Sequence, residues 1–292
     1  MGILFSILSA LFFGLYTLPK KLSKLPPFMY TILMAVGFTV SSSLAYLMYL
    51  ATGNPFDLNN ANLLYSALAG VLWAIAFTLL VASIDRIGVV RSNQWKNLQG
   101  PIGVGLNLLF LGEAARVNPY LALIAGVLIF LSAVFFNNKS ATQTKANDKG
   151  VWLAIASGVL FGLVSLINNF VTKTAGIYNQ QLVWSVSILI TMVVLAVAFK
   201  KFSLIELKNI KEFSLATFSG VLYFGASVFM LLAFKNIESA IAFNITQLSF
   251  LVVVVAGVFY FKEYNLKAHW KNLLLGTLLA VIGVFVLSFA RG

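Results

Sequence analysis

Residues 63–82 have the sequence Leu-Leu-Tyr-Ser-Ala-Leu-Ala-Gly-Val-Leu-Trp-Ala-Ile-Ala-Phe-Thr-Leu-Leu-Val-Ala and contain no charged side chain. A helix needs roughly 17–25 mostly apolar residues to cross a hydrocarbon core of about 30 Å. This stretch meets that requirement, and its length and composition are typical of a transmembrane helix. It therefore predicts that the chain lies in a bilayer.

The rest of the 292-residue chain contains further apolar stretches of this kind. The predicted spans are 2–19, 28–50, 63–82, 88–111, 119–136, 151–172, 181–199, 213–234, 239–261 and 270–289. The composition agrees, because 60% of the residues are hydrophobic, only 10% are charged, and the mean hydropathy is +0.95. Such values exclude an ordinary soluble domain. We predict an all-α, multi-pass protein of the cell membrane with ten transmembrane helices.

The sequence of the third span recurs later in the chain. Gly70-Val71-Leu72-Trp73 aligns with Gly220-Val221-Leu222-Tyr223 at a shift of 150, which also places Glu113 on Glu263. Leu11-Phe12-Phe13-Gly14-Leu15 matches Val159-Leu160-Phe161-Gly162-Leu163 at a shift of 148. We predict two five-helix repeats, 1–137 and 151–292, joined by a cytoplasmic linker, 138–150. Because five is odd, the second repeat is inverted, which is typical of alternating-access carriers with a site near the midplane.

The basic residues are distributed unevenly between the predicted links. Links after the first, third, fifth, seventh and ninth spans hold 15 Lys and Arg, whereas the opposite side holds 4. The positive-inside rule therefore predicts that both termini are outside. The formal net charge is +12, but Lys and Arg form no continuous basic stripe interleaved with aromatic residues. No nucleic-acid partner is predicted.

Residues for catalysis and metal binding are scarce. The chain has no Cys, one His (His269) and eight carboxylates. This excludes thiol chemistry and Cys- or His-built zinc sites, and we predict neither an enzyme nor a cofactor. A channel is the weaker alternative, since no acidic ring or carbonyl filter motif is visible.

The fourth predicted span is too polar for a helix that faces lipid. It contains Arg91-Ser92-Asn93-Gln94-Trp95-Lys96-Asn97-Leu98-Gln99-Gly100-Pro101. Lys96 lies about 9 residues inside the span, which corresponds to about 13 Å of depth. A lysine at this depth is expected to line a cavity or to have a partner. The alternative is that Lys96 binds backbone carbonyls that Pro101 leaves without a hydrogen bond.

Polar residues in the fourth and ninth spans suggest a shared binding surface. Asn93, Lys96, Asn97 and Gly100 fall at helical spacing on one face. The ninth span places Thr246 and Gln247 at the positions equivalent to Lys96 and Asn97. The alternative is hydrogen bonding between helices, which uses the same residue types.

The predicted substrate-binding residues come from five spans, and the aromatic ones are chosen because aromatic faces stack on sugar rings. They are Asn93, Gln94, Lys96, Asn97, Trp73, Asn168, Asn169, Tyr223, Asn244 and Gln247. Packing remains the alternative for each aromatic residue. For Glu113 and Glu263, at span ends, we favour a capping or packing role over proton coupling.

Several motifs resemble the drug/metabolite transporter superfamily. Leu111-Gly112-Glu113 and Lys262-Glu263 close the fourth and ninth spans, and Ile84-Asp85-Arg86-Ile87-Gly88-Val89 is similar to the bacterial glucose/ribose porter branch. The resemblance implies secondary transport of a sugar, with protons as a candidate coupling ion. Residues 91–99 are more polar and cationic than the small Ser/Thr-rich stretch of that branch.

The leading prediction is a secondary carrier that moves a small polar metabolite, foremost a monosaccharide, by alternating access. The alternative is a carrier for a carboxylate or phosphorylated metabolite, with Lys96 as its charge partner. The expected partners are the small-molecule substrate and the lipid bilayer. The small residues Gly276, Ala280 and Gly283 suit packing within the repeat or a dimer contact, so that a monomer and a homodimer both remain open.

Overall fold

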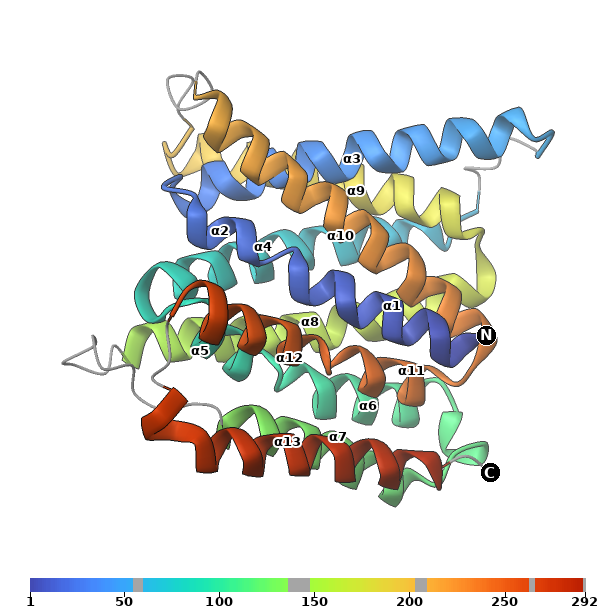
Figure 1. Cartoon of the computed structure of the whole chain (residues 1–292). Coiled ribbons are helices and arrows are strands. Elements are labelled where there is room, and N and C mark those ends of the chain that lie inside the picture. Colours follow the sequence, from blue (N-terminus) through green and yellow to red (C-terminus); the bar gives the residue numbers. More distant parts are fainter. Residues whose placement is uncertain (55–59, 136–147, 203–208, 263–265, 291–292) are drawn as a thin grey trace.

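The computed structural model describes residues 1–54, 60–135, 148–202, 209–262 and 266–290, and every regular element among them is a helix (Figure 1). The elements are α1 (Gly2–Leu15), α2 (Leu18–Leu22), α3 (Pro27–Ala51), α4 (Leu63–Ile87), α5 (Val89–Lys96), α6 (Gln99–Phe110), η1 (Glu113–Ala115), α7 (Pro119–Phe135), α8 (Asp148–Thr174), α9 (Ile177–Ala198), α10 (Ile210–Asn236), α11 (Ser239–Thr246), α12 (Ser249–Val255), η3 (Ala256–Tyr260) and α13 (Leu266–Ser288).

Within these described ranges, eight helical segments are long and apolar enough to cross a membrane. Two of them are composite, because α1–α2 and α11–α12–η3 each form one continuous segment, Gly2–Leu22 and Ser239–Tyr260. The 17-residue α7 and the polar α5–α6 fall outside this criterion. The all-α, multi-pass class is confirmed, while the count of ten spans and the inverted repeat stay predictions.

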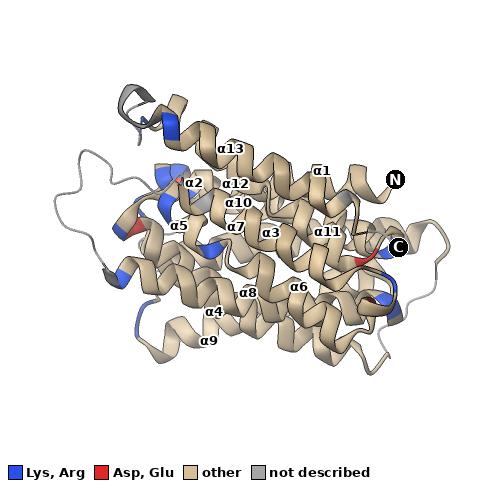
Figure 2. Ribbon diagram, turned by 90° about the horizontal axis from the view of Figure 1, so that it is seen from below, with Lys and Arg blue, Asp and Glu red and all other residues tan. Residues whose placement is uncertain are grey.

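The long helices lie side by side in a bundle with both chain ends at one end of it (Figure 1). We call this the terminal end, and it also carries η1. The opposite end, with Leu18–Leu22, is the α2 end. Figure 2 shows Lys and Arg gathered mainly at the α2 end, with fewer at the terminal end. The charge asymmetry of the sequence is therefore an asymmetry of the folded molecule.

Glycines allow the central helices to approach each other closely. A β-carbon at Gly37 of α3 would overlap the carbonyl of Thr217 in α10, and one at Gly220 of α10 would overlap the carbonyl of Met34. Small residues at crossings are the usual device in membranes, where helices associate by packing rather than by exclusion of water.

The small residues of α13 pack inside the molecule, against α7. Gly276, Ala280 and Gly283 are buried, and a β-carbon at Gly283 would lie 2.9 Å from Ile129 Cγ1. Because α7 belongs to the first predicted repeat and α13 to the second, this packing lies between the repeats, and the prediction that Gly283 packs within its own repeat is wrong.

Two helices are interrupted in the middle of the bundle. α5 ends at Lys96 and α6 begins at Gln99, and because Pro101 has no N–H, the carbonyl of Asn97 accepts from the Gly100 N–H at 2.9 Å instead. α11 and α12 separate at Gln247–Leu248. There the side chains of Thr246 and Gln247 both donate to the carbonyl of Phe243, at 2.7 and 3.1 Å, in competition with the backbone.

The two interruptions contact each other. Asn97 Nδ2 donates to the carbonyl of Gln247 at 3.3 Å, and Gln99 Nε2 donates to Gln247 Oε1 at 2.8 Å. Gly100 allows this approach, since a β-carbon there would lie 2.9 Å from Gln247 Cγ. Polar backbone and side chains therefore meet in the middle of an otherwise apolar bundle.

Candidate substrate-binding site

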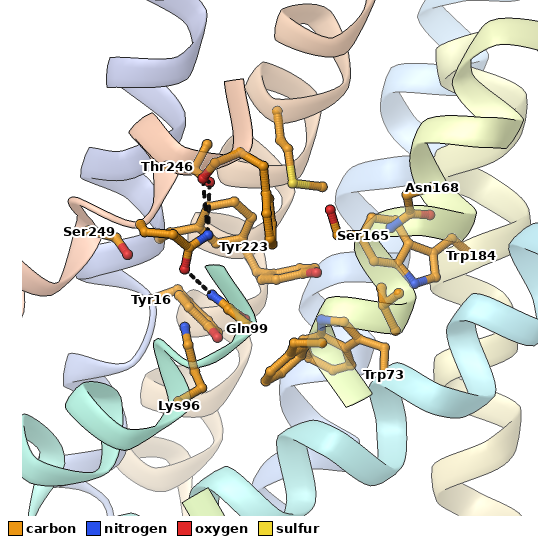
Figure 3. Close-up of a pocket in the computed structure, with 16 residues that line it drawn as sticks. Tyr16, Trp73, Lys96, Gln99, Ser165, Asn168, Trp184, Tyr223, Thr246 and Ser249 are labelled. Atoms are coloured by element: carbon orange, nitrogen blue, oxygen red, sulfur yellow. Dashed lines mark hydrogen bonds between the residues drawn. The ribbon is translucent and has the colours of Figure 1, made fainter. Parts of the chain in front are cut away.

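A cavity lies in the bundle beside the two helix interruptions (Figure 3). Its volume is about 40 Å³, counted as the space open to the centres of water molecules. Pockets for drug-sized ligands are about 300–1,000 Å³, so the cavity in this conformation is smaller than an open site of that kind. Its walls are Phe13, Tyr16, Trp73, Lys96, Gln99, Phe161, Val164, Ser165, Asn168, Trp184, Tyr223, Met230, Phe243, Thr246, Gln247 and Ser249.

Aromatic rings form much of the wall. The centroid of the Tyr223 ring lies 4.7 Å from that of Trp73, 5.2 Å from that of Tyr16 and 5.8 Å from that of Trp184. Trp73 and Trp184 are fully buried, and Trp73 also stacks on Phe77 at 4.8 Å. These ring contacts fix the rings in place and leave flat apolar surface toward the cavity.

Lys96 of α5 brings an ammonium group to this wall, on the same side of the cavity as Tyr16 and Gln99 (Figure 3). The residue is 3% exposed, and its ammonium lies 5.6 Å from the centroid of the Phe161 ring. Within the described parts of the chain, Nζ has no hydrogen-bond or ion-pair partner. In particular, it donates to no carbonyl beside Pro101, so the geometry favours the cavity role predicted for Lys96 over the alternative.

Four further polar groups on the wall are buried without a hydrogen-bond partner among the described residues. They are Trp73 Nε1, Trp184 Nε1, Asn168 Nδ2 and Ser165 Oγ. Gln180 Nε2 donates to Asn168 Oδ1 at 3.2 Å, which fixes the amide with its nitrogen unpaired. Buried polar atoms are nearly always bonded, so unpaired donors on a cavity wall mark positions where a bound molecule can accept.

The structure brings together half of the predicted site residues. Trp73, Lys96, Asn168, Tyr223 and Gln247 line the cavity. Their side chains come from α4, α5, α8, α10 and the α11–α12 interruption.

The other five predicted residues are buried away from the cavity wall. Asn93 donates to the carbonyl of Val89, Asn97 to that of Gln247 and Asn244 to that of Ala122. Asn169 donates to Glu113, and Gln94 is 1% exposed but does not line the cavity. For Asn97, Asn169 and Asn244, hydrogen bonding between helices, the alternative to substrate binding, describes their contacts.

The sequence interpretation missed several wall residues that the repeat would have indicated. Phe13 and Phe161 are matched at a shift of 148, and both line the cavity. At a shift of 150, Gln99 is matched with Ser249, and both line it. These four residues are partners only of one another, whereas projecting the candidates Asn93 and Lys96 at a shift of 150 would have found the wall residues Phe243 and Thr246. Nothing in the sequence distinguishes Trp184 from other apolar aromatics.

The terminal end is closed by hydrogen bonds to Glu113. Its carboxylate accepts from the N–H groups of Ser239 and Ala240 at 3.1 and 2.9 Å and from Ser239 Oγ at 2.8 Å. It also accepts from Asn169, and Lys173 Nζ lies 3.3 Å away. Glu113 therefore caps α11, and the predicted capping role is confirmed, whereas Glu263 lies outside the described residues.

These contacts determine the ionisation of Glu113. Burial raises the pKa of its carboxyl, but the hydrogen bonds from Ala240 and Ser239 and the charge of Lys173 lower it by more. The net result is a pKa below the ordinary value, so the carboxylate is charged at neutral pH.

The α2 end is closed by two other carboxylates. Lys20, almost fully buried, forms an ion pair with Asp85 at 2.8 Å and donates to the carbonyl of Leu25 at 2.8 Å. Glu212 of α10 accepts from Ser23 Oγ and from the N–H of Lys24. Polar contacts thus connect the helices at both ends of the bundle.

Comparison with known proteins identifies the family. A family model described as sugar transport protein matches residues 4–290. The chain belongs to the sugar transport protein family. Its members are membrane transporters rather than enzymes, and the resemblance to sugar porters and the prediction of a non-enzymatic sugar transporter are thereby confirmed.

Individual relatives of this sugar transport protein are distant in sequence. A Listeria monocytogenes protein named as a sugar uptake protein is 24% identical over 306 residues, covering 100% of both chains. A Staphylococcus aureus protein named as a glucose uptake protein is 23% identical and covers 86% of this chain and 87% of its own. A crystal structure with 14% identity has a TM-score of 0.73 over 98% of each chain, which shows a shared fold.

Proposed function

We propose that the chain is a secondary carrier that moves a monosaccharide across the cell membrane by alternating access. The observation that carries this proposal is the mid-bundle cavity with aromatic walls and unpaired buried donors. A sugar ring presents an apolar face to an aromatic surface and a rim of hydroxyls to hydrogen-bond donors. Trp73 and Tyr223 would supply the first contact, and Asn168 and Trp184 the second.

We further propose that ten spans form two inverted repeats, with α5–α6 and α7 as the fourth and fifth. The packing supports this, because α1 contacts α10, α11 and α12, while the equivalent α8 contacts α4, α5 and α6. A β-carbon at Gly14 would overlap Val252, and one at the equivalent Gly162 would lie 2.6 Å from the equivalent Ile102. The interruptions at Asn97 and Gln247 are also 150 residues apart.

Alternating access would then require the two ends to open in turn. Opening the terminal end means breaking the hydrogen bonds of Glu113 to Ser239 and Ala240 while the ion pair between Lys20 and Asp85 stays intact. Opening the α2 end means breaking that ion pair while the Glu113 hydrogen bonds stay intact. Rocking of one repeat against the other around a fixed site is the usual motion of such carriers. In the proposed orientation, the basic α2 end faces the cytoplasm and both termini face outward.

The test is uptake of labelled sugars into proteoliposomes that contain the purified protein. We expect saturable uptake, and Trp73→Ala should lower it about three- to tenfold through lost stacking. Trp152→Ala is the matched control, since Trp152 is 68% exposed and outside the cavity. Non-saturating flux, or normal uptake by Trp73→Ala, would contradict the proposal. Acceleration by an imposed proton gradient would establish proton coupling.

A carrier for a carboxylate or phosphorylated metabolite that is not a sugar is the second candidate. The observation that favours it is the Lys96 ammonium on the cavity wall without a counterion among the described residues. Thermal stabilisation of wild type and Lys96→Gln by neutral sugars and by small anions separates the two. Stabilisation by non-sugar anions alone, lost in Lys96→Gln, would support the second candidate.

A further inference from the structure

We propose that the sugar accepted by this cavity carries a carboxylate, as uronic and aldonic acids do, and that the carboxylate binds the Lys96 ammonium. This inference rests on the proposed function, since it takes the cavity as the sugar site. It adds the chemical class of the sugar.

The chain contains a second buried lysine, which shows how a structural lysine is accommodated here. Lys20 is 2% exposed and pairs with Asp85, with a carbonyl oxygen as a second acceptor. Lys96 is 3% exposed and has neither kind of acceptor within the described ranges, only the ring of Phe161. A buried ammonium is costly unless it is paired, so Lys96 is suited to an anion that arrives with the substrate.

No carboxylate of the described residues lines the cavity to neutralise Lys96. Asp85 and Glu212 are bonded at the α2 end, and Glu113 is bonded at the terminal end. The wall therefore has a formal charge of +1 when Lys96 is protonated. An incoming monoanion would make the occupied cavity neutral.

The hydrogen-bonding character of the wall also favours an anion. Its unpaired groups include three N–H donors, on Trp73, Trp184 and Asn168, besides the ammonium of Lys96. Two of its amide oxygens already accept a hydrogen bond, because Gln247 Oε1 accepts from Gln99 and Asn168 Oδ1 accepts from Gln180. Every hydroxyl of a neutral sugar must also donate, whereas a carboxylate only accepts. A carboxylated sugar matches this surplus of donors better than the parent sugar does.

Lys96 also breaks the symmetry of the wall. Phe13 corresponds to Phe161, and Trp73 to Tyr223, so aromatic residues face aromatic residues across the two repeats. Lys96 corresponds to Thr246, which keeps a hydroxyl but no charge. A substrate with one charged end would therefore bind in a single orientation, with that end on α5.

The experiment compares matched sugars in proteoliposomes that contain the full chain. The probes are glucose with glucuronate and galactose with galacturonate, glucuronamide as the uncharged counterpart, and lactate as an anion that is not a sugar. We expect kcat/KM for the uronates to exceed that for the parent sugars and the amide by more than about tenfold. Lys96→Thr, which copies the residue of the second repeat, should abolish this preference by lowering kcat/KM for the uronates to the level of the parent sugars and the amide.

Each outcome decides between the two proposals. Equal or better transport of the parent sugars would overturn the carboxylate inference and leave the proposed function intact. Transport of lactate without any sugar, or of no probe at all, would overturn both. If Lys96→Thr fails to fold, the comparison of glucuronate with glucuronamide on the wild type remains decisive, because it needs no variant.

Discussion

At the residue scale, Glu113 connects helices that are far apart in the sequence. Its carboxylate follows α6, caps α11 and contacts Asn169 and Lys173 of α8. Replacing it by Gln keeps its size but removes the charge that attracts the N–H groups at the start of α11. We expect Glu113→Gln to lower the free energy of unfolding by about 1–2 kcal/mol. Thermal unfolding in detergent would measure this.

The Glu113 contribution should depend on pH in one direction. Its folded pKa lies below the ordinary value of 4.5, so the stabilisation is complete above that value and is lost as the pH falls through the folded pKa. The difference in Tm between wild type and Glu113→Gln should therefore shrink on acidification. The half-buried neighbour Glu238, which caps no N–H, provides the control variant Glu238→Gln. A difference that grows on acidification would contradict this account.

Half of the candidate site could be predicted at this scale, because the polar residues of one segment have different roles. Asn93 and Lys96 lie in the same uninterrupted helix, α5, yet Lys96 lines the cavity while Asn93 donates to the carbonyl of Val89. Asn97 follows the end of α5 and donates to the carbonyl of Gln247. Polarity alone did not distinguish a side chain that lines a cavity from one that holds two helices together.

At the scale of elements, the crossing of α3 and α10 depends on the absence of side chains. At Gly220, an added methyl group would overlap the carbonyl of Met34. We expect Gly220→Ala to destabilise the protein by about 1–3 kcal/mol, because two helix backbones must separate. A lower Tm together with reduced uptake would be the measured result.

Gly105 of α6 offers the matched control for that substitution. The nearest atom to a β-carbon there would be Leu123 Cδ2 at 3.8 Å, an ordinary contact. Gly105→Ala should be neutral or stabilising by up to about 1 kcal/mol, since alanine favours the helix. An equal fall in Tm for Gly220→Ala and Gly105→Ala would contradict this account, because the loss of stability would then not come from the helix crossing.

The helices themselves were largely predictable, and their interruptions only in part. Pro101 signals the break between α5 and α6, because proline cannot donate the helical hydrogen bond. No proline or glycine marks the break at Gln247–Leu248, where side chains of Thr246 and Gln247 bond the carbonyl of Phe243. That competition depends on side-chain conformation, which the residue pattern does not specify.

At the scale of the whole molecule, the proposed orientation can be tested with single cysteines, because the natural chain has none. Asn54 is exposed beyond α3 near the terminal end, and Lys201 is exposed beyond α9 near the α2 end. We expect a membrane-impermeant maleimide to label Asn54→Cys in intact cells. Lys201→Cys should react only after permeabilisation. The opposite pattern would reverse the orientation.

Composition and periodicity predicted the class of the molecule because apolar length is set directly by bilayer thickness. The relation between the halves depends on contacts between distant segments, such as Asn97 with Gln247. The sequence could show that both segments are polar, but not that their two interruptions meet. The cavity lies beside the contact between these two interruptions.

The length of α3 has a consequence for the surrounding lipid. At 25 residues it spans about 38 Å, more than the roughly 30 Å hydrocarbon thickness of an average bilayer. A helix that is longer than the hydrocarbon core imposes hydrophobic mismatch, which tilting of the helix relieves. α3 must therefore tilt further as phospholipid acyl chains shorten, so transport rates should depend on acyl-chain length, and the choice of lipid becomes part of the carrier's working environment.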